Sequence, residues 1–192
     1  MNTDARIRTR KSPEARKKEL FTVGIEAFAE RGIGRATHAD IAERAGVSVP
    51  TVFNYFPNRE LLVEMIIKHS VDTVRERIRS AFLSHPNSDP RIVLLNEVIR
   101  LTKSHCKLVT IILECNASIR AETRYWLSAK QELLDLLIKK SNLTEWDAMV
   151  YLGTLSEACQ KELLEPAFIP TENPSNFISE HFLKDHFVHA SA

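Results

Sequence analysis

The stretch AGVSVPTVFNYFPNRE, residues 45–60, places three aromatic rings beside a proline, two hydroxyl side chains and an asparagine. Gly46 occupies a position at which a left-handed residue typically ends a helix. Ser48 is a preferred N-cap residue, and Pro50 is tolerated in a first helical turn because its missing N–H costs little there. The stretch therefore predicts a tight glycine turn followed by a short third helix over residues 48–58.

The apolar residues of this short helix fall on one face. They recur at i, i+3, i+4 and i+7, the spacing of a helix packed against a core, and they are Val49, Val52, Phe53 and Phe56. We expect this face to pack on apolar residues of the preceding helices, namely Leu20, Phe28, Ile41 and Ala45. This helical spacing predicts that the side chains of Phe53 and Phe56 are both buried in the core.

The opposite face of the same helix is polar. It carries Thr51, Asn54 and Tyr55, with Ser48 at its N-terminal edge and Pro50 in the first turn. Asparagine makes paired hydrogen bonds to adenine, hydroxyls and the tyrosine phenol reach phosphates, and threonine or proline contacts a thymine methyl. A solvated polar face is the alternative. The caps, the glycine turn, the apolar face and the basic N-terminus together favour recognition of a DNA groove.

A longer helix is predicted before this stretch, over residues 13–31. Pro13 suits its opening turn, and Gly32 and Gly34 end it. Apolar residues recur through it at helical spacing, namely Leu20, Val23, Ala27 and Phe28. It therefore supplies a supporting surface for the shorter helices that follow.

A second helix is predicted between the supporting helix and the glycine turn. Thr37 and Asp40 form a T-x-x-D capping pair that opens a helix over residues 38–45. Two short helices joined by a tight glycine turn, after a longer supporting helix, form the helix-turn-helix pattern.

The first residues of the chain are strongly basic. Among residues 1–18, seven Lys and Arg stand against two Asp and Glu, while the whole chain has a net charge of +1. A basic segment on a nearly neutral body indicates a polyanionic partner for that end. A solvated, disordered tail is the alternative explanation.

The rest of the chain is predicted to be helical as well. Only 5 glycines occur, and no alternating strand pattern is present. Further helices are expected at about 59–83, 90–106, 108–118, 121–140, 144–165 and from about 175 to 188. We predict an all-α fold of about nine helices, divided into a basic arm (1–11), a helix-turn-helix domain (12–58) and a helical regulatory and dimerisation domain (59–192).

Composition restricts the class of protein. No apolar run approaches the roughly 18 residues that a transmembrane helix needs, and no apolar stretch follows the basic N-terminus as in a secretory signal. The 3 cysteines, Cys106, Cys115 and Cys159, are odd in number and not closely spaced. This pattern favours a reducing cytoplasm over a disulfide framework.

The helix-turn-helix segment resembles that of a known family. DIAERAGVS followed by TVFNYF resembles the DNA-binding domain of TetR-type regulators. RTRKSP, RGIGRATHADIAERAGVSVPTVFNYFPNRELLV and LECNASIRAETRYWL resemble the LuxR/HapR-type quorum-sensing master regulators of vibrios. The resemblance is strong over residues 8–64, fainter over 105–127, and only architectural after residue 130.

The resemblance implies a DNA-binding homodimer that both activates and represses. It implies that Arg8 and Arg10 of the arm enter the minor groove and that Ser48, Thr51, Asn54 and Tyr55 form the recognition face. We count Thr37 and Pro50 among the DNA-contacting residues as well. Two long C-terminal helices would form the dimer interface. Candidate packing positions in the first of these are Trp146, Met149, Val150, Gly153, Leu155 and Ser156.

The sequence departs from the family pattern at two positions. Pro50 stands where TetR-type proteins usually have glycine or alanine, which bears on base preference. Cys115 stands where the vibrio branch tends to have a tryptophan lining its cavity. Phe82, Cys115 and Trp126 are candidates to line a cavity for an unidentified small apolar ligand, with plain core packing as the alternative.

Other chemistries find less support in the sequence. His181, Asp185 and His189 share one helix face, but without a supporting motif a solvated helix end is the better explanation than a metal site. Cys106 beside His105 suggests a thiolate, although a buried structural cysteine is favoured. No convergent set of acid, base and nucleophile is present, so we expect no enzymatic activity, no cofactor and no metal.

The sequence therefore predicts a cytoplasmic, nucleoid-associated transcription regulator. Its expected partners are a double-stranded, pseudo-palindromic DNA operator and a second copy of the chain, with no membrane. A quorum-sensing master regulator is the first hypothesis. The alternative is a local TetR-type repressor of an efflux or metabolic gene, released by its ligand.

Overall fold

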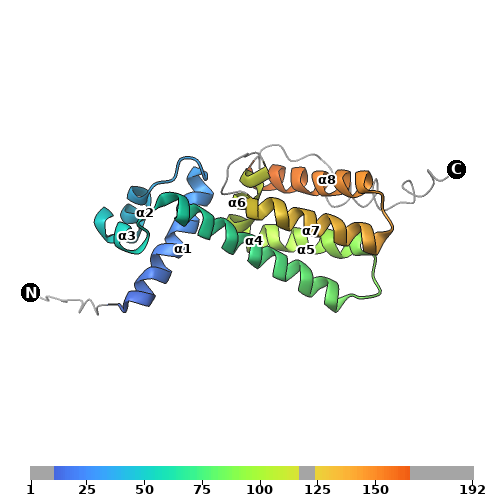
Figure 1. Ribbon diagram of the computed structural model, residues 1–192, viewed down its shortest axis with the longest axis horizontal. Helices are drawn as coiled ribbons and strands as arrows, with labels where there is room; N and C mark the ends of the chain where they lie inside the picture. The colour runs from blue at the N-terminus through green and yellow to red at the C-terminus, as the bar shows by residue number, and fades with distance from the viewer. Residues whose placement is uncertain (1–10, 117–123, 165–192) are drawn as a thin grey trace, which may run out of the picture. The chain divides into compact units, whose positions relative to one another are not determined.

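The computed structural model describes residues 11–116 and 124–164, and these residues form eight α-helices with no strand among them (Figure 1). The prediction of an all-helical chain is confirmed. The final predicted helix, up to residue 188, lies outside the described residues. The chain divides into two compact units, Met1–Leu62 and Val63–Ala192. The three-part division expected from the sequence, with a boundary after residue 58, stays a prediction.

The first unit contains α1 (Pro13–Arg31), α2 (His38–Ala45) and α3 (Val49–Tyr55). The Ser12 hydroxyl accepts a hydrogen bond of 3.2 Å from the Ala15 N–H, and Pro13 takes the first helical position, where a missing N–H is harmless. Helix α1 ends at Gly32, whose φ of 89° suits glycine. The α1 and α2 boundaries match the prediction.

The N-terminus of α2 is closed by the predicted capping pair. The Asp40 N–H donates to the Thr37 hydroxyl at 3.3 Å, and the Asp40 carboxylate accepts from the Thr37 N–H at 2.8 Å. At the other end Gly46 adopts the left-handed conformation at φ 63°, and the chain turns there into α3. Both features satisfy backbone groups that a helix end leaves unpaired.

Helix α3 is shorter than predicted. Ser48 has the extended backbone of an N-cap but makes no side-chain capping bond, and Phe56 already leaves the helix with φ −134°. The core of this unit is built from α1, the α1–α2 connection, α2 and α3. Its most deeply buried members are Leu20, Ala27, Phe28, Ala36, Ile41, Ala42, Val52 and Phe56.

Helix α4 (Arg59–Ser84) opens with the Leu61 N–H donating to the Asn58 side chain at 3.1 Å. The second unit then adds α5 (Pro90–Ser104), α6 (Cys106–Asn116), α7 (Arg124–Ser141) and α8 (Glu145–Leu164). Helices α5, α7 and α8 lie alongside one another (Figure 1). These helices differ from the predicted spans by a few residues at their ends.

Apolar side chains and a few long-range polar bonds hold the second unit together. Leu94, Leu101, Leu137, Ala148 and Tyr151 are among the residues buried in its core. The Tyr151 hydroxyl donates to the Arg91 carbonyl at 2.6 Å, so the start of α5 is joined to α8. Burial of the ring raises the pKa of Tyr151, so the phenol stays protonated and remains a donor.

Candidate functional site

The polar side chains predicted to contact DNA lie together on α3 and its N-cap. Ser48, Pro50 and Asn54 are exposed, while Thr51 and Tyr55 are partly buried. The Ser48 and Thr51 hydroxyls lie 2.8 Å apart and hydrogen-bond to each other. Asn54 therefore presents its amide to solvent beside a pair of hydroxyls, on the exposed side of a helix anchored by Val52 and Phe56.

Phe53 does not lie in the core, so that prediction is wrong. Its side chain is 44% exposed and stacks flat on the His38 ring, with centroids 4.2 Å apart and planes 5° apart. The reason is the short length of α3, because Val52 and Phe56 already fill the space against the neighbouring helices. Val49, also predicted to be core, is 37% exposed for the same reason.

His38 links α2 to α3 beneath the Phe53 ring. The side chain is buried, and its Nε2 lies 2.7 Å from the Phe56 carbonyl oxygen. Because a carbonyl only accepts, Nε2 carries the proton in this bond. The imidazole therefore links the end of α3 to the start of α2. The Phe53 ring stacked on it lies at the edge of the polar face.

Arg59 holds the α1–α2 connection from the start of α4. Its guanidinium donates to the Ile33 carbonyl at 2.6 Å and to the Ala36 carbonyl at 3.0 Å, and it lies 5.7 Å from the centre of the Phe28 ring. Sequence reasoning missed this role, because a lone arginine in a first helical turn resembles an ordinary surface cation. The contact fixes the segment that leads directly into Thr37.

Thr37 is exposed, and its hydroxyl already caps the N-terminus of α2. Its hydroxyl donates to Asp40 at 2.8 Å, which is the chief cause that lowers the pKa of Asp40 below its usual value, and the charge of Arg31 adds to the effect. Arg31 lies 3.1 Å from the same carboxylate. Arg8 and Arg10 of the predicted arm lie outside the described residues.

The second unit encloses an apolar cavity of about 120 Å³. It is bounded by side chains from α4 to α8, and Trp126 of α7 is its largest lining residue. The lining is almost entirely apolar, although Lys130, Ser156 and Cys159 are among the residues that border the cavity. The Cys159 sulfur lies 3.5 Å from the Thr102 hydroxyl, and burial raises the pKa of this thiol.

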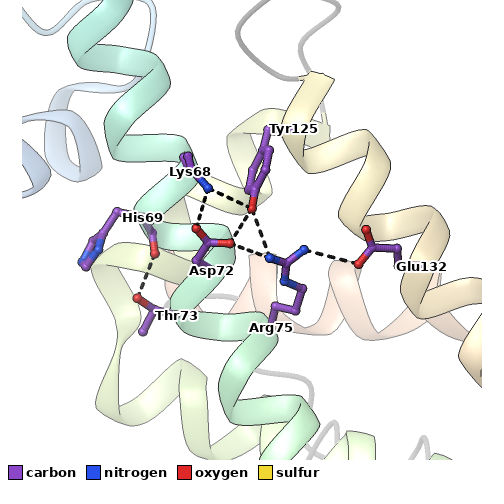
Figure 2. A network of polar contacts seen from close by, with 7 residues as sticks. All are labelled: Lys68, His69, Asp72, Thr73, Arg75, Tyr125 and Glu132. Atoms are coloured by element: carbon purple, nitrogen blue, oxygen red, sulfur yellow. Dashed lines mark hydrogen bonds and ion pairs between the residues drawn. The ribbon is translucent and has the colours of Figure 1, made fainter.

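A larger groove of about 700 Å³ lies between α4 and α7. Its lining combines apolar and charged side chains, and the charged ones include those of the network in Figure 2. Tyr125 is the centre of that network: its hydroxyl donates to Asp72 at 2.5 Å and accepts from Lys68 at 3.2 Å and Arg75 at 3.1 Å. The hydrogen bond from Tyr125 is the main cause that lowers the pKa of Asp72.

The three residues predicted to line a ligand cavity lie in different places. Trp126 borders both the cavity and the groove, and Phe82 borders only the groove. Cys115 borders neither; it is buried, donates to the Ile111 carbonyl at 3.2 Å, and burial raises its pKa to about 12. The structure thus brings only Trp126 and Phe82 to the same groove.

Two other hypotheses from the sequence concern a cysteine and a metal site. Cys106 is exposed, so the expectation of a buried structural cysteine is wrong there. His181, Asp185 and His189 lie outside the described residues. Within residues 11–116 and 124–164 no group of three or more potential metal ligands is found. No helix in this part of the chain is long and apolar enough to cross a membrane.

Comparison with known proteins defines the class. Residues 20–66 match the family model for bacterial regulatory proteins of the tetR family. The helix-turn-helix segment of the first unit is therefore similar to that of TetR-type regulators. A member of the TetR family from Streptomyces coelicolor A3 superposes with a TM-score of 0.65 at 18% identity, over 86% of this chain and 96% of that one. AibR, solved in complex with isovaleryl coenzyme A and operator DNA, superposes with a TM-score of 0.68 at 19% identity, over 90% of this chain and 98% of AibR.

A more specific likeness is to the HTH-type transcriptional regulator LuxR of Vibrio harveyi. The two sequences are 46% identical over 124 residues, which are 61% of this chain and 58% of LuxR. The matched segment therefore spans less than two thirds of the relative. The predicted resemblance to TetR-type regulators, and within them to the vibrio branch, is confirmed.

Proposed function

We propose that this chain is a sequence-specific DNA-binding transcriptional regulator. The observation that carries the proposal is the exposed polar face of α3, held on a helix-turn-helix unit whose sequence matches the TetR model. Ser48 makes no side-chain capping bond, and within the described part of the chain the Ser48 and Thr51 hydroxyls bond to each other. Both are therefore available to phosphates or base edges.

The chemistry of this face gives each residue a distinct role in the major groove. Asn54 would make paired hydrogen bonds to adenine, and Pro50 and Thr51 would contact a thymine methyl. Tyr55 and Ser48 would anchor the helix to phosphates. The arm residues Arg8 and Arg10 would enter an A·T-rich minor groove. Deleting residues 1–10 should then weaken binding more at A·T-rich than at G·C-rich flanks, and an equal loss at both would refute minor-groove recognition.

The second copy of the chain would dock on α8. Trp146 and Met149 are 72% and 49% exposed, and Gly153 is exposed one turn further along the same helix face. Leu155 is buried and Ser156 borders the cavity, so these two members of the predicted interface face inward instead. An apolar stripe with a glycine permits close approach of a symmetry-related helix.

The first hypothesis for its cellular role is a quorum-sensing master regulator, supported by the likeness to LuxR. The alternative is a local repressor released by a ligand. The apolar cavity supports that alternative, because AibR is a chain of the same fold solved with isovaleryl coenzyme A. Both roles place the protein in the cytoplasm, at the nucleoid.

Genome-wide occupancy in the source cell tests the proposal and separates the two roles. A master regulator should occupy many sites that share one pseudo-palindromic motif. A local repressor should occupy a site beside its own gene and few others. Occupancy without a shared motif, or none above background, would refute sequence-specific regulation.

A further inference from the structure

We propose that Glu19 limits the non-specific binding of DNA by this chain, because its carboxylate competes with DNA phosphates for the side chains of Lys11 and Arg16. Glu19 lies in the second turn of α1, on the helix that follows the basic arm. The inference rests on the proposed function, since it concerns how strongly the chain binds duplex DNA of any sequence. It adds to that function a residue that acts on affinity for non-operator DNA, outside the recognition face of α3.

The Glu19 carboxylate accepts hydrogen bonds from two basic side chains. Lys11 Nζ lies 2.7 Å from Glu19 Oε1, and a guanidinium nitrogen of Arg16 lies 2.8 Å from Oε2. Each carboxylate oxygen therefore has a cation of its own. The hydrogen bond from Lys11 is the main cause that lowers the pKa of Glu19 below its usual value, so the carboxylate is ionised at neutral pH and retains both partners.

The pairing divides the cations at the start of α1 into two groups. Residues 11–18 contain four Lys and Arg side chains. Lys17 and Lys18 are exposed and form no ion pair within the described part of the chain, whereas Lys11 and Arg16 are both bound to Glu19. Non-specific binding of duplex DNA comes almost entirely from contacts between free cations and phosphates. Glu19 therefore withholds two of the four cations from such contacts.

The two ion pairs are weak enough to exchange with phosphates. The side chains are 49% exposed for Lys11 and 28% exposed for both Arg16 and Glu19. Exposed ion pairs are screened by salt and contribute little to stability. Loss of the Glu19 charge should therefore change DNA binding and leave the fold intact.

The test compares Glu19→Gln with Glu14→Gln, measured by fluorescence anisotropy on a labelled duplex of random sequence. Both substitutions remove one negative charge from the start of α1 and keep the size of the side chain. Glu14 is exposed and has no ion pair with any residue that the structure describes, so its substitution releases no cation.

The two variants should differ in affinity and in salt dependence. We expect Glu19→Gln to bind the random duplex about three- to tenfold more tightly than the unmodified chain at low salt. The slope of log affinity against log salt concentration should become steeper by about one to two, about one for each released cation. Glu14→Gln should change that slope by less than about half a unit.

Substitution of the two cations shows whether they cause the gain. Lys11→Gln combined with Arg16→Gln should reverse the gain in affinity and slope when made in the Glu19→Gln chain. The same two substitutions should weaken binding less in the unmodified chain, because Glu19 already occupies both cations there. Competition predicts this difference, whereas a general effect of charge would make the changes additive. Circular dichroism checks the fold of every variant.

Four results would overturn the proposal. Equal gains in Glu14→Gln and Glu19→Gln, or additive effects in the combined variants, would show only an effect of net charge. No gain in Glu19→Gln would show that its carboxylate does not compete with phosphates, and a loss would show that Glu19 supports DNA binding. In each of these cases the unmodified chain still binds DNA, so the proposed function stands. An unmodified chain that binds no duplex at any salt concentration would refute both.

Discussion

Asn54 and Phe53 are neighbours on α3 with opposite roles. Asn54 is exposed and makes no side-chain hydrogen bond to the residues that the structure describes, whereas Phe53 stacks on the buried His38 ring. The sequence pattern separates a polar face from an apolar face, but it cannot show that the seven-residue helix buries only Val52, with Phe56 buried at its C-cap. The placement of Phe53 is therefore a tertiary effect.

Substitution of these two residues should separate DNA binding from stability. Asn54→Ala should weaken operator binding by about 1–3 kcal/mol and leave the free energy of unfolding unchanged. Phe53→Ala should lower the free energy of unfolding by about 1–2 kcal/mol, because the ring is only partly buried and loses one stacked partner. Chemical denaturation measures the free energy of unfolding, and a titration with operator DNA measures the binding. Loss of stability in Asn54→Ala would show that its amide supports the fold.

The cysteines give a second test at the residue scale. An aromatic disulfide reagent should modify one thiol per native chain, Cys106, because it is exposed. Cys115 and Cys159 are buried, and burial raises the pKa of both thiols, so they should react only in denaturant. Cys106→Ser should remove the native reaction. Rapid reaction of two or more thiols in the native chain would contradict the packing of α6 or α8.

At the scale of elements, the sequence predicts what local chemistry determines. The Thr37–Asp40 capping box and the left-handed Gly46 both lie where the sequence predicts them. Contacts between distant elements were not predictable in this way. The Asp72–Tyr125 bond joins residues far apart in sequence, and neither residue has a local pattern that identifies its partner. The polar network along the groove between α4 and α7 was not predicted for this reason, although Phe82 and Trp126, which border the groove, were candidates to line a cavity.

Arg59 tests how the helix-turn-helix unit is held together. Arg59→Met keeps the alkyl stem but removes two hydrogen bonds to the α1–α2 connection, so stability should fall by about 1–3 kcal/mol. The matched control is Arg35→Met in the same connection, which loses one exposed bond to the Arg31 carbonyl and should change stability by less than about 0.5 kcal/mol. Unchanged stability with weakened DNA binding in Arg59→Met would instead make Arg59 a direct DNA contact.

At the scale of the whole molecule, two short recognition helices need a fixed separation to contact two half-sites. In the proposed dimer, the exposed face of α8 would supply the apolar surface for this assembly. Met149→Glu should convert a dimer to a monomer in light scattering at micromolar concentration. Leu83→Glu, at an apolar position near the end of α4 that is 72% exposed, should leave the dimer mass unchanged. A dimer that survives Met149→Glu would place the interface elsewhere.

If α3 recognises DNA sequence as part of a two-fold dimer, selection of bound fragments from a random DNA library should reveal the symmetry of its sites. We expect an enriched motif of two inverted half-sites, centred about 10 base pairs or a multiple apart. The same selection with Asn54→Ala should lose preference at the adenine positions of each half-site. An asymmetric motif, no motif, or an identical motif with Asn54→Ala would show that α3 does not recognise DNA in this way.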